Sequence, residues 1–148
     1  MSDTLKALAS LVVKEDVSLG GLPAAAQKLA LAIAHASLPP GRVLNEREVN
    51  EALKAALAGC ACWLATDHVE LRRWLVDAGW LVRDGFGREY RALPHAELRA
   101  ELQPLARTLA TVDLQNWVAA ERERWQADRT ARRERWLAEQ AAQPPGEG

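Results

Sequence analysis

The stretch that most constrains the fold covers residues 67–93, DHVELRRWLVDAGWLVRDGFGREYRAL. Its first part has apolar residues at helical spacing after Asp67, whose carboxylate can accept a hydrogen bond from a first-turn amide. Glu70, three residues later, is expected to complete a capping box. Gly79 stands where a helix commonly ends on a residue in the left-handed conformation. Beyond it, WLVR and REYRAL flank DGFG, a pattern typical of two strands joined by a tight turn. The stretch therefore predicts a helix followed directly by a β-hairpin.

Two longer helices and a short one are predicted before this stretch. The best marked begins after Asn45, with Glu48 completing a capping box and with Leu44 and Val49 placed as a hydrophobic staple. The helix before it begins near Pro23, a favourable first-turn residue. Its apolar stripe, at helical spacing, consists of Leu22, Ala26, Leu29, Ala30 and Ile33. Residues 4–15 form the short helix, which ends before the glycine pair of SLGG.

Three helices followed by a hairpin is the order of elements in a winged helix. We therefore predict a mainly α fold with a small β-hairpin: a winged-helix-like core with a C-terminal helical extension. The expected divisions are an N-terminal helix and loop at residues 1–21, the winged-helix-like domain at 22–93, the extension at 94–140 and a disordered tail at 141–148.

The extension contains two helical patterns. The first is a heptad seam, at steps of four, three, four and three, made of Leu98, Leu102, Leu105, Leu109 and Val112. Pro104 lies inside this seam and must either kink the helix or begin a new one. The second pattern is a long last helix for which Asp113 is the expected N-cap.

Residues 22–93 resemble a bacterial family known as domain of unknown function 2087. The matching stretches are LPAAAQKLALAIA, PPGRVLNEREVNEALK and LRRWLVDAGWLVRDGFGREYRA. In that family the domain occurs alone or attached to DNA-binding transcriptional regulators, and its own role is unassigned. The resemblance therefore implies the fold and a regulatory setting, and it carries over no catalytic residue. The connection AGCACWLAT departs from the family, in which it is usually shorter.

The arginines of the hairpin stretch are the candidate DNA contacts: Arg72, Arg73, Arg88 and Arg91. Residues 67–91 hold five arginines and five acids, and the whole chain has a formal charge of −1, so neither supplies a field that attracts phosphates. The alternative is that the arginines pair with Glu70, Asp77 and nearby carboxylates. Val69 and Val76, on the same outward face, would then contact another element.

The last helix carries a stripe of large aromatic residues, Trp117, Trp125 and Trp136, on the same side as Leu114 and Val118. From residue 113 to 139 six acids balance six arginines, so a basic membrane-surface helix is not expected. Large aromatics dominate interface energies, which favours docking on a protein partner or a second copy. The alternative is that Trp117 and Trp125 fold back on the core and leave only Trp136 exposed.

Signals for metal binding or catalysis are weak. Cys60, Cys62 and His68 are one ligand short of a structural zinc site and lack the usual cysteine spacing, so we expect no metal. The chain has no glycine-rich phosphate loop, no His-Glu-x-x-His and no G-x-S-x-G motif, and we expect neither a cofactor nor an enzyme. Asn50, on the edge of an apolar face, is expected to satisfy a backbone group.

The first residues, MSDTLKALAS, lack the pattern of a signal peptide, and no run of about 18 apolar residues is present, so we expect a cytoplasmic protein without a membrane span. Two interpretations of function remain open. In one, the chain is a non-enzymatic regulatory protein whose winged-helix-like domain serves protein interaction or self-assembly. In the other, it is a DNA-binding transcriptional regulator that uses the third helix and the wing.

Overall fold

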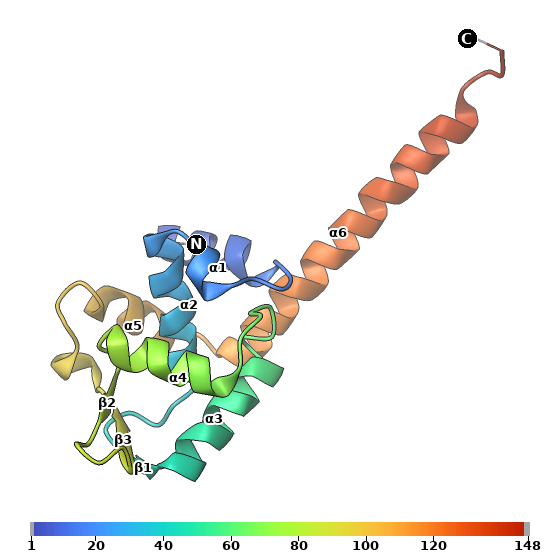
Figure 1. Cartoon of the computed structure of the whole chain (residues 1–148). Helices are drawn as coiled ribbons and strands as arrows, with labels where there is room; N and C mark the ends of the chain where they lie inside the picture. The colour runs from blue at the N-terminus through green and yellow to red at the C-terminus, as the bar shows by residue number, and fades with distance from the viewer. Residues whose placement is uncertain (1, 147–148) are drawn as a thin grey trace.

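The computed structural model describes residues 2–146, so Met1 of the predicted N-terminal segment and the last two residues of the predicted tail lie outside it. The fold is mainly helical with a small antiparallel sheet, as predicted (Figure 1). The helices are α1 (Asp3–Val12), α2 (Ala24–Ala36), α3 (Glu46–Ala58), α4 (His68–Asp77), α5 (Gln103–Ala110) and α6 (Leu114–Ala142). The strands are β1 (Val43–Asn45), β2 (Leu81–Arg83) and β3 (Glu89–Ala92), and short 3₁₀ helices cover Leu19–Gly21 and His95–Glu97.

Helix α2 lies at the centre of the domain, where α1, α4 and α5 all contact it (Figure 1). The sequence predicted one buried stripe on this helix. In the structure every residue from Leu29 to His35 is buried, so the second half of α2 is covered on all sides. Ala30, Ala32 and Ala34 make this possible, because small side chains let neighbouring helices approach closely.

The start of α3 confirms the predicted capping box. The Glu48 amide donates to Asn45 Oδ1 at 2.8 Å, and the Asn45 amide donates to Glu48 Oε1 at 3.1 Å. The strand β1, directly before this cap, was not predicted. It pairs with β3, which also pairs with β2, so the predicted hairpin is part of a three-stranded sheet in the order β1-β3-β2.

Helix α4 begins and ends at the predicted residues, but its cap is simpler than predicted. The Glu70 amide donates to Asp67 Oδ1 at 2.8 Å. The second half of the predicted box is absent because the Glu70 carboxylate instead accepts from the Thr66 hydroxyl at 2.9 Å. At the other end, Gly79 has φ +84°, the left-handed conformation expected there. A Cβ on Gly79 would also lie 2.8 Å from the Arg99 guanidinium, which donates to the Ala78 carbonyl.

The predicted heptad seam of the extension is interrupted at Pro104, and of the two predicted outcomes the structure has the start of a new helix. Pro104 lies in the first turn of α5 and begins a new helix, since proline has no amide to donate inside one. The seam residues on either side of this start are buried in the core of the chain: Leu98, Leu102 and Leu109. Helix α5 packs against α2, so this segment belongs to the domain and offers no leucine face to a partner.

Helix α6 begins after Asp113, as predicted, and extends to Ala142, so Ala141 and Ala142 of the predicted tail are helical. The Asp113 side chain makes no cap hydrogen bond to the backbone and instead accepts from the Asn116 amide group at 2.6 Å. The first third of α6 packs against α1, and the rest projects away from the domain (Figure 1). Every described residue from Glu123 onwards is exposed.

Candidate functional site

Of the four candidate DNA-contacting arginines, Arg72 is the one most enclosed by other residues. Its guanidinium donates to Asn50 Oδ1 at 2.5 Å and lies 3.5 Å from a Glu46 carboxylate oxygen. It also lies over the Tyr90 ring, 5.2 Å from the ring centre, and only 16% of its side chain is exposed. Arg72 therefore ties α4 to α3 and β3. These partners differ from Glu70 and Asp77, the carboxylates that the sequence suggested for Arg72. Asn50 accepts the hydrogen bond of this guanidinium, whereas the prediction was that it would bond to a backbone group.

Arg91 on β3 is also paired within the chain. It donates to both carboxylate oxygens of Glu97, at 2.8 and 3.3 Å. The hydrogen bonds and the opposite charge raise the pKa of Arg91 and lower the pKa of Glu97. The pair lies on the surface, where solvent screens it, so we expect it to fix local geometry more than to stabilise the fold.

Arg73 and Arg88 are exposed, and neither has a carboxylate within ion-pair distance among residues 2–146. A hollow of about 290 Å³ lies between side chains of α4 and of the sheet, and its lining includes Arg73, Arg83 and Val76. In the turn, Asp84 accepts hydrogen bonds from the backbone amides of Phe86 and Arg88, and such bonds hold the pKa of its carboxyl below the usual range.

Apolar side chains also face outwards on this side of the domain. Val69 on α4 is 41% exposed, Val82 on β2 is 44% exposed, and Phe86 at the tip of the turn is 85% exposed. Sequence reasoning identified Val69 and Val76 but passed over Phe86, although DGFG was recognised as a turn and an aromatic residue is unusual there. The surface therefore combines exposed arginines with exposed apolar side chains.

The base of α6 is held to α1 by a cluster that sequence reasoning missed. Arg122 donates to the carbonyls of Val12 at 2.8 Å and Lys14 at 2.9 Å, and it forms an ion pair with Glu15. Val118, one turn earlier, is buried, and Glu121 is buried beside Arg124, whose guanidinium lies 3.1 Å from its carboxylate. The partners of Arg122 lie more than 100 residues away in the sequence, so no local pattern identified this anchor.

The three predicted tryptophans of α6 differ in environment. Trp117 is half-buried against the core, whereas Trp125 is 44% exposed and Trp136 is 57% exposed. Leu137, which was not predicted as a contact residue, is 48% exposed although it directly follows Trp136 in the sequence. Arg132 lies over the Trp125 ring, 5.6 Å from its centre. The helix thus presents large apolar side chains beyond the point at which the domain ends.

A groove of about 410 Å³ lies between α1 and α6. Trp125 forms part of its lining, and α1 and the residues just after it supply Ala9, Ser10, Val13 and Lys14. Charged side chains of α6 complete the rim: Glu121, Arg124 and Asp128. The groove therefore has an apolar floor with charges around it, next to the point at which α6 leaves the domain.

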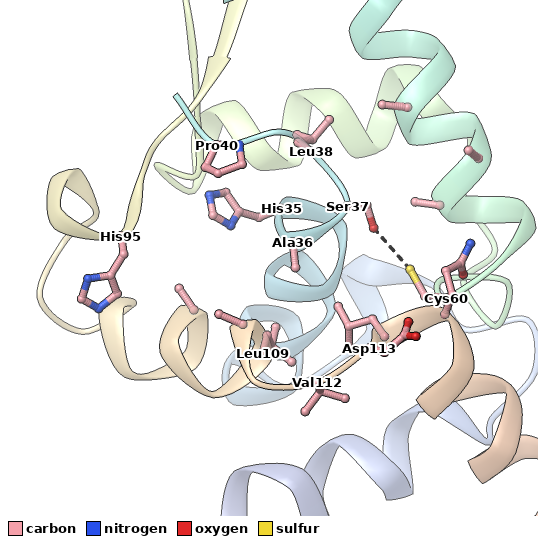
Figure 2. A pocket seen from close by; sticks show the side chains of 17 residues that line it. His35, Ala36, Ser37, Leu38, Pro40, Cys60, His95, Leu109, Val112 and Asp113 are labelled. Carbon is pink, nitrogen blue, oxygen red and sulfur yellow. Dashed lines mark hydrogen bonds between the residues drawn. The ribbon is translucent and has the colours of Figure 1, made fainter. Parts of the chain in front are cut away.

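A larger cavity of about 600 Å³ lies where the end of α2, α3, α5 and the start of α6 meet (Figure 2). Many of its lining residues are alanines, with Leu38, Leu109 and Val112 among the larger apolar ones. Ser37 and Cys60 share a hydrogen bond of 3.3 Å at its wall, and burial raises the pKa of the Cys60 thiol (Figure 2).

His35, which also lines that cavity, is held by a hydrogen bond to the backbone. Its Nε2 lies 2.8 Å from the Leu93 carbonyl oxygen, so Nε2 carries the proton and donates, because a carbonyl can only accept. The ring also packs on buried Trp80, with 5.0 Å between the ring centres. Burial lowers the pKa of His35, which outweighs the opposite effect of the hydrogen bond.

The three side chains that were weighed as possible metal ligands, Cys60, Cys62 and His68, do not form a cluster in the part of the chain that the structure describes. Cys60 is buried, whereas Cys62 is exposed and His68 begins α4. Within residues 2–146 no group of three or more His, Cys, Asp or Glu side chains is placed to hold a metal ion. Nor, within that range, does any helix combine the length and the apolar character needed to cross a membrane.

Comparison with known proteins gives a single family. A family model described as an uncharacterized protein conserved in bacteria (DUF2087) matches residues 22–92, the segment from the start of α2 to the end of β3. No curated protein and no solved structure matches the chain.

Proposed function

We propose that this chain, whose residues 22–92 belong to the uncharacterized bacterial family DUF2087, is a non-enzymatic regulatory protein that serves protein interaction or self-assembly. The observation that carries the proposal is the outer part of α6, residues 123–142, which projects from the domain. Its large apolar side chains are exposed: Trp125, Trp136 and Leu137. A cytoplasmic location fits the proposal, because Cys60 and Cys62 are unlinked and would stay reduced there.

We infer that residues 22–93 form a winged-helix-like core. The order α2, β1, α3, α4, β2 and β3, with β1 paired to the far strand of the hairpin, supports this interpretation. In such a core α4 takes the place of the recognition helix and the turn around Phe86 takes the place of the wing. A regulatory role follows from this likeness by analogy alone, since one fold serves many functions.

The energetics of α6 favour an interaction role. Most helices in proteins owe their stability chiefly to the packing of an apolar face against other parts of the structure. The outer part of α6 has no such packing in a single copy, yet it bears two exposed tryptophans. Tryptophan is enriched among residues that dominate binding energy at interfaces. A binding partner would bury these side chains and stabilise the helix that carries them.

Removing the part of α6 that follows Asp128 tests this proposal. A chain that ends at Asp128 keeps the Arg122 anchor and the groove, and it loses Trp136 and Leu137. We expect the shortened chain to unfold at an unchanged temperature and to lose association that the full chain shows in light scattering and in affinity capture from a bacterial lysate. If the full chain associates with nothing in either assay, or if the shortened chain associates equally well, the interaction role is contradicted.

DNA binding is the second candidate function, and the exposure of Arg73, Arg83 and Arg88 around α4 and the wing favours it. Arg72 and Arg91 are engaged within the chain, so they would have to exchange their partners to reach DNA. Binding of a random duplex library at low salt provides the test. We expect any DNA complex to weaken steeply with salt and with Arg73→Ala plus Arg88→Ala. A selection that enriches no sequence contradicts this function.

A further inference from the structure

We propose that the outer part of α6 pairs with the same helix of a second copy in antiparallel orientation, so that Trp136 of each copy occupies the groove between α1 and α6 of the other. This inference rests on the proposed interaction role and names its partner. It accounts for two features that a single copy leaves exposed, the groove beside Trp125 and the side chain of Trp136.

The groove and Trp136 lie on the same side of α6. Trp125 and Trp136 are 11 residues apart, which is three helical turns and about 16 Å along the axis. Val118 and Glu121, which are buried where α6 packs on α1, lie on this side as well. The face that is covered by α1 near the domain therefore continues outwards as the face that bears Trp136.

Trp125 and Trp136 are equally far along the sequence from the point between Thr130 and Ala131. A two-fold axis that crosses α6 at right angles at this point therefore places Trp136 of one copy opposite Trp125 of the other. Such a rotation brings Trp136 of each copy to the groove beside Trp125 of the other. The contact is the same in both directions, so it closes at two copies and leaves no open end for further addition. The groove of about 410 Å³ falls within the range of sites that enclose small organic groups, so it has room for an indole.

The order of charges favours the antiparallel orientation. At the end of the groove nearest the domain are Lys14 and Arg124, with Glu121 already paired to Arg124; at the outer end is Asp128. On the incoming antiparallel helix, Glu139 reaches the inner end and Arg133 reaches Asp128. A parallel helix with Trp136 in the same groove would reverse this order. It would place Glu139 near Asp128 and Arg133 near Arg124, so that like charges meet.

Two arginines limit the strength of the pairing. Arg129 of one copy lies opposite Arg132 of the other, close to the two-fold axis, and like charges across a helix pair are destabilising. Arg132 lies over the ring of Trp125, and the negative face of the ring attracts its charge and offsets part of this repulsion. We therefore expect a reversible dimer that dissociates on dilution.

The test measures the mass of the full chain by light scattering and sedimentation over a series of protein concentrations. We expect the mass to rise from one copy to two, and we expect Trp136→Ala to hold it at one copy. Leu137→Ala is the matched control, because Leu137 is also exposed but lies about a third of a turn away from the groove-facing side. Circular dichroism shows that each variant keeps its helices.

A charge exchange tests the orientation. Asp128→Arg and Arg133→Glu should each weaken the dimer, and the two changes in one chain should restore it, because these residues meet only between antiparallel copies. A full chain that stays monomeric at every concentration overturns the inference, as does equal loss of dimer in Trp136→Ala and Leu137→Ala, or failure of the double variant to recover. If the chain is monomeric but still captures a lysate protein through the segment after Asp128, the dimer is refuted and the interaction role is not.

Discussion

The guanidinium of Arg72 donates a hydrogen bond of 2.5 Å to the side-chain oxygen of Asn50, joining α4 to α3. Two polar residues that the sequence placed on separate helices thus satisfy one another. The same guanidinium lies over the Tyr90 ring of β3, so one side chain connects all three elements around the hollow beside α4. Arg72 therefore has a structural role in connecting these elements, whereas contact with the edge of a DNA base would require a free guanidinium.

Arg72→Ala should lower the free energy of unfolding by about 1–3 kcal/mol, because it leaves Asn50 without its donor and uncovers Tyr90. Arg73→Ala is the matched control, since Arg73 follows it on the same helix and is exposed. A surface change of this kind typically stays within about 0.5 kcal/mol. Urea denaturation followed by circular dichroism measures both, and equal effects of the two substitutions would refute the structural role of Arg72.

His35 should make the protein less stable in mild acid. Burial lowers its pKa in the folded state below the ordinary value of 6.5, so below that value the unfolded chain binds more protons than the folded one. Stability is therefore fully present above about pH 6.5 and declines as the pH falls towards the folded pKa. The loss is about 1.4 kcal/mol for each unit by which the folded pKa is lowered.

Thermal unfolding between pH 5 and pH 8 measures this effect, and His35→Gln isolates it. The glutamine does not titrate in this range, so the stability of the variant should vary less with pH than that of the parent chain. His95→Gln, at an exposed position, is the control and should keep the parent slope. The same slope in His35→Gln and the parent would show that His35 does not carry the effect.

Signals that depend on neighbouring residues were predictable from the sequence. The box between Asn45 and Glu48 and the left-handed Gly79 both follow from hydrogen bonds or conformations within a few residues. Strand β1 was missed because its three residues form a strand only by pairing with β3, more than 40 residues away. A segment that short has no periodicity of its own to detect.

The seam from Leu98 to Val112 was predictable as an apolar pattern with a break at Pro104, but the elements before the break were not. The leucines are buried, as an apolar stripe predicts, but they reach the core through a 3₁₀ turn, a bend and a short helix. Pro104 was the local sign of that break. Which surface the leucines cover, α2 of the same chain, depends on tertiary packing that the spacing does not contain.

The candidate site was predictable on α6 and unpredictable beyond it. The tryptophan stripe identified Trp125 and Trp136 as large side chains on one helix face, and both are exposed. The groove beside Trp125 needs Ala9 and Val13 of the N-terminal segment, whose approach to α6 depends on contacts across more than 100 residues. Small apolar residues such as Ala9 and Val13 occur throughout protein sequences, so nothing in the local sequence identifies them as part of a groove.

Arg122→Ala should loosen the base of α6. It removes the donor to the carbonyls of Val12 and Lys14 at the end of α1 and breaks the ion pair with Glu15. We expect a loss of about 1–3 kcal/mol in the free energy of unfolding and faster amide exchange in α1 and the first turns of α6. Arg135→Ala, further out on the same helix and exposed, is the control and should change neither. Unchanged exchange in α1 would show that Arg122 is no anchor.

The two cysteines should differ sharply towards thiol reagents. Cys62 is exposed, whereas Cys60 is buried beside Ser37, and burial raises the pKa of its thiol and so reduces the reactive thiolate. In native protein we expect one thiol per chain to react quickly with a disulfide reagent and the second only when the fold opens. Cys62→Ser should abolish the fast phase and Cys60→Ser should keep it, with urea exposing the remaining thiol in each. A fast phase that survives in Cys62→Ser would mean that the cavity wall around Cys60 opens readily in solution, because a closed wall leaves that sulfur out of reach of the reagent.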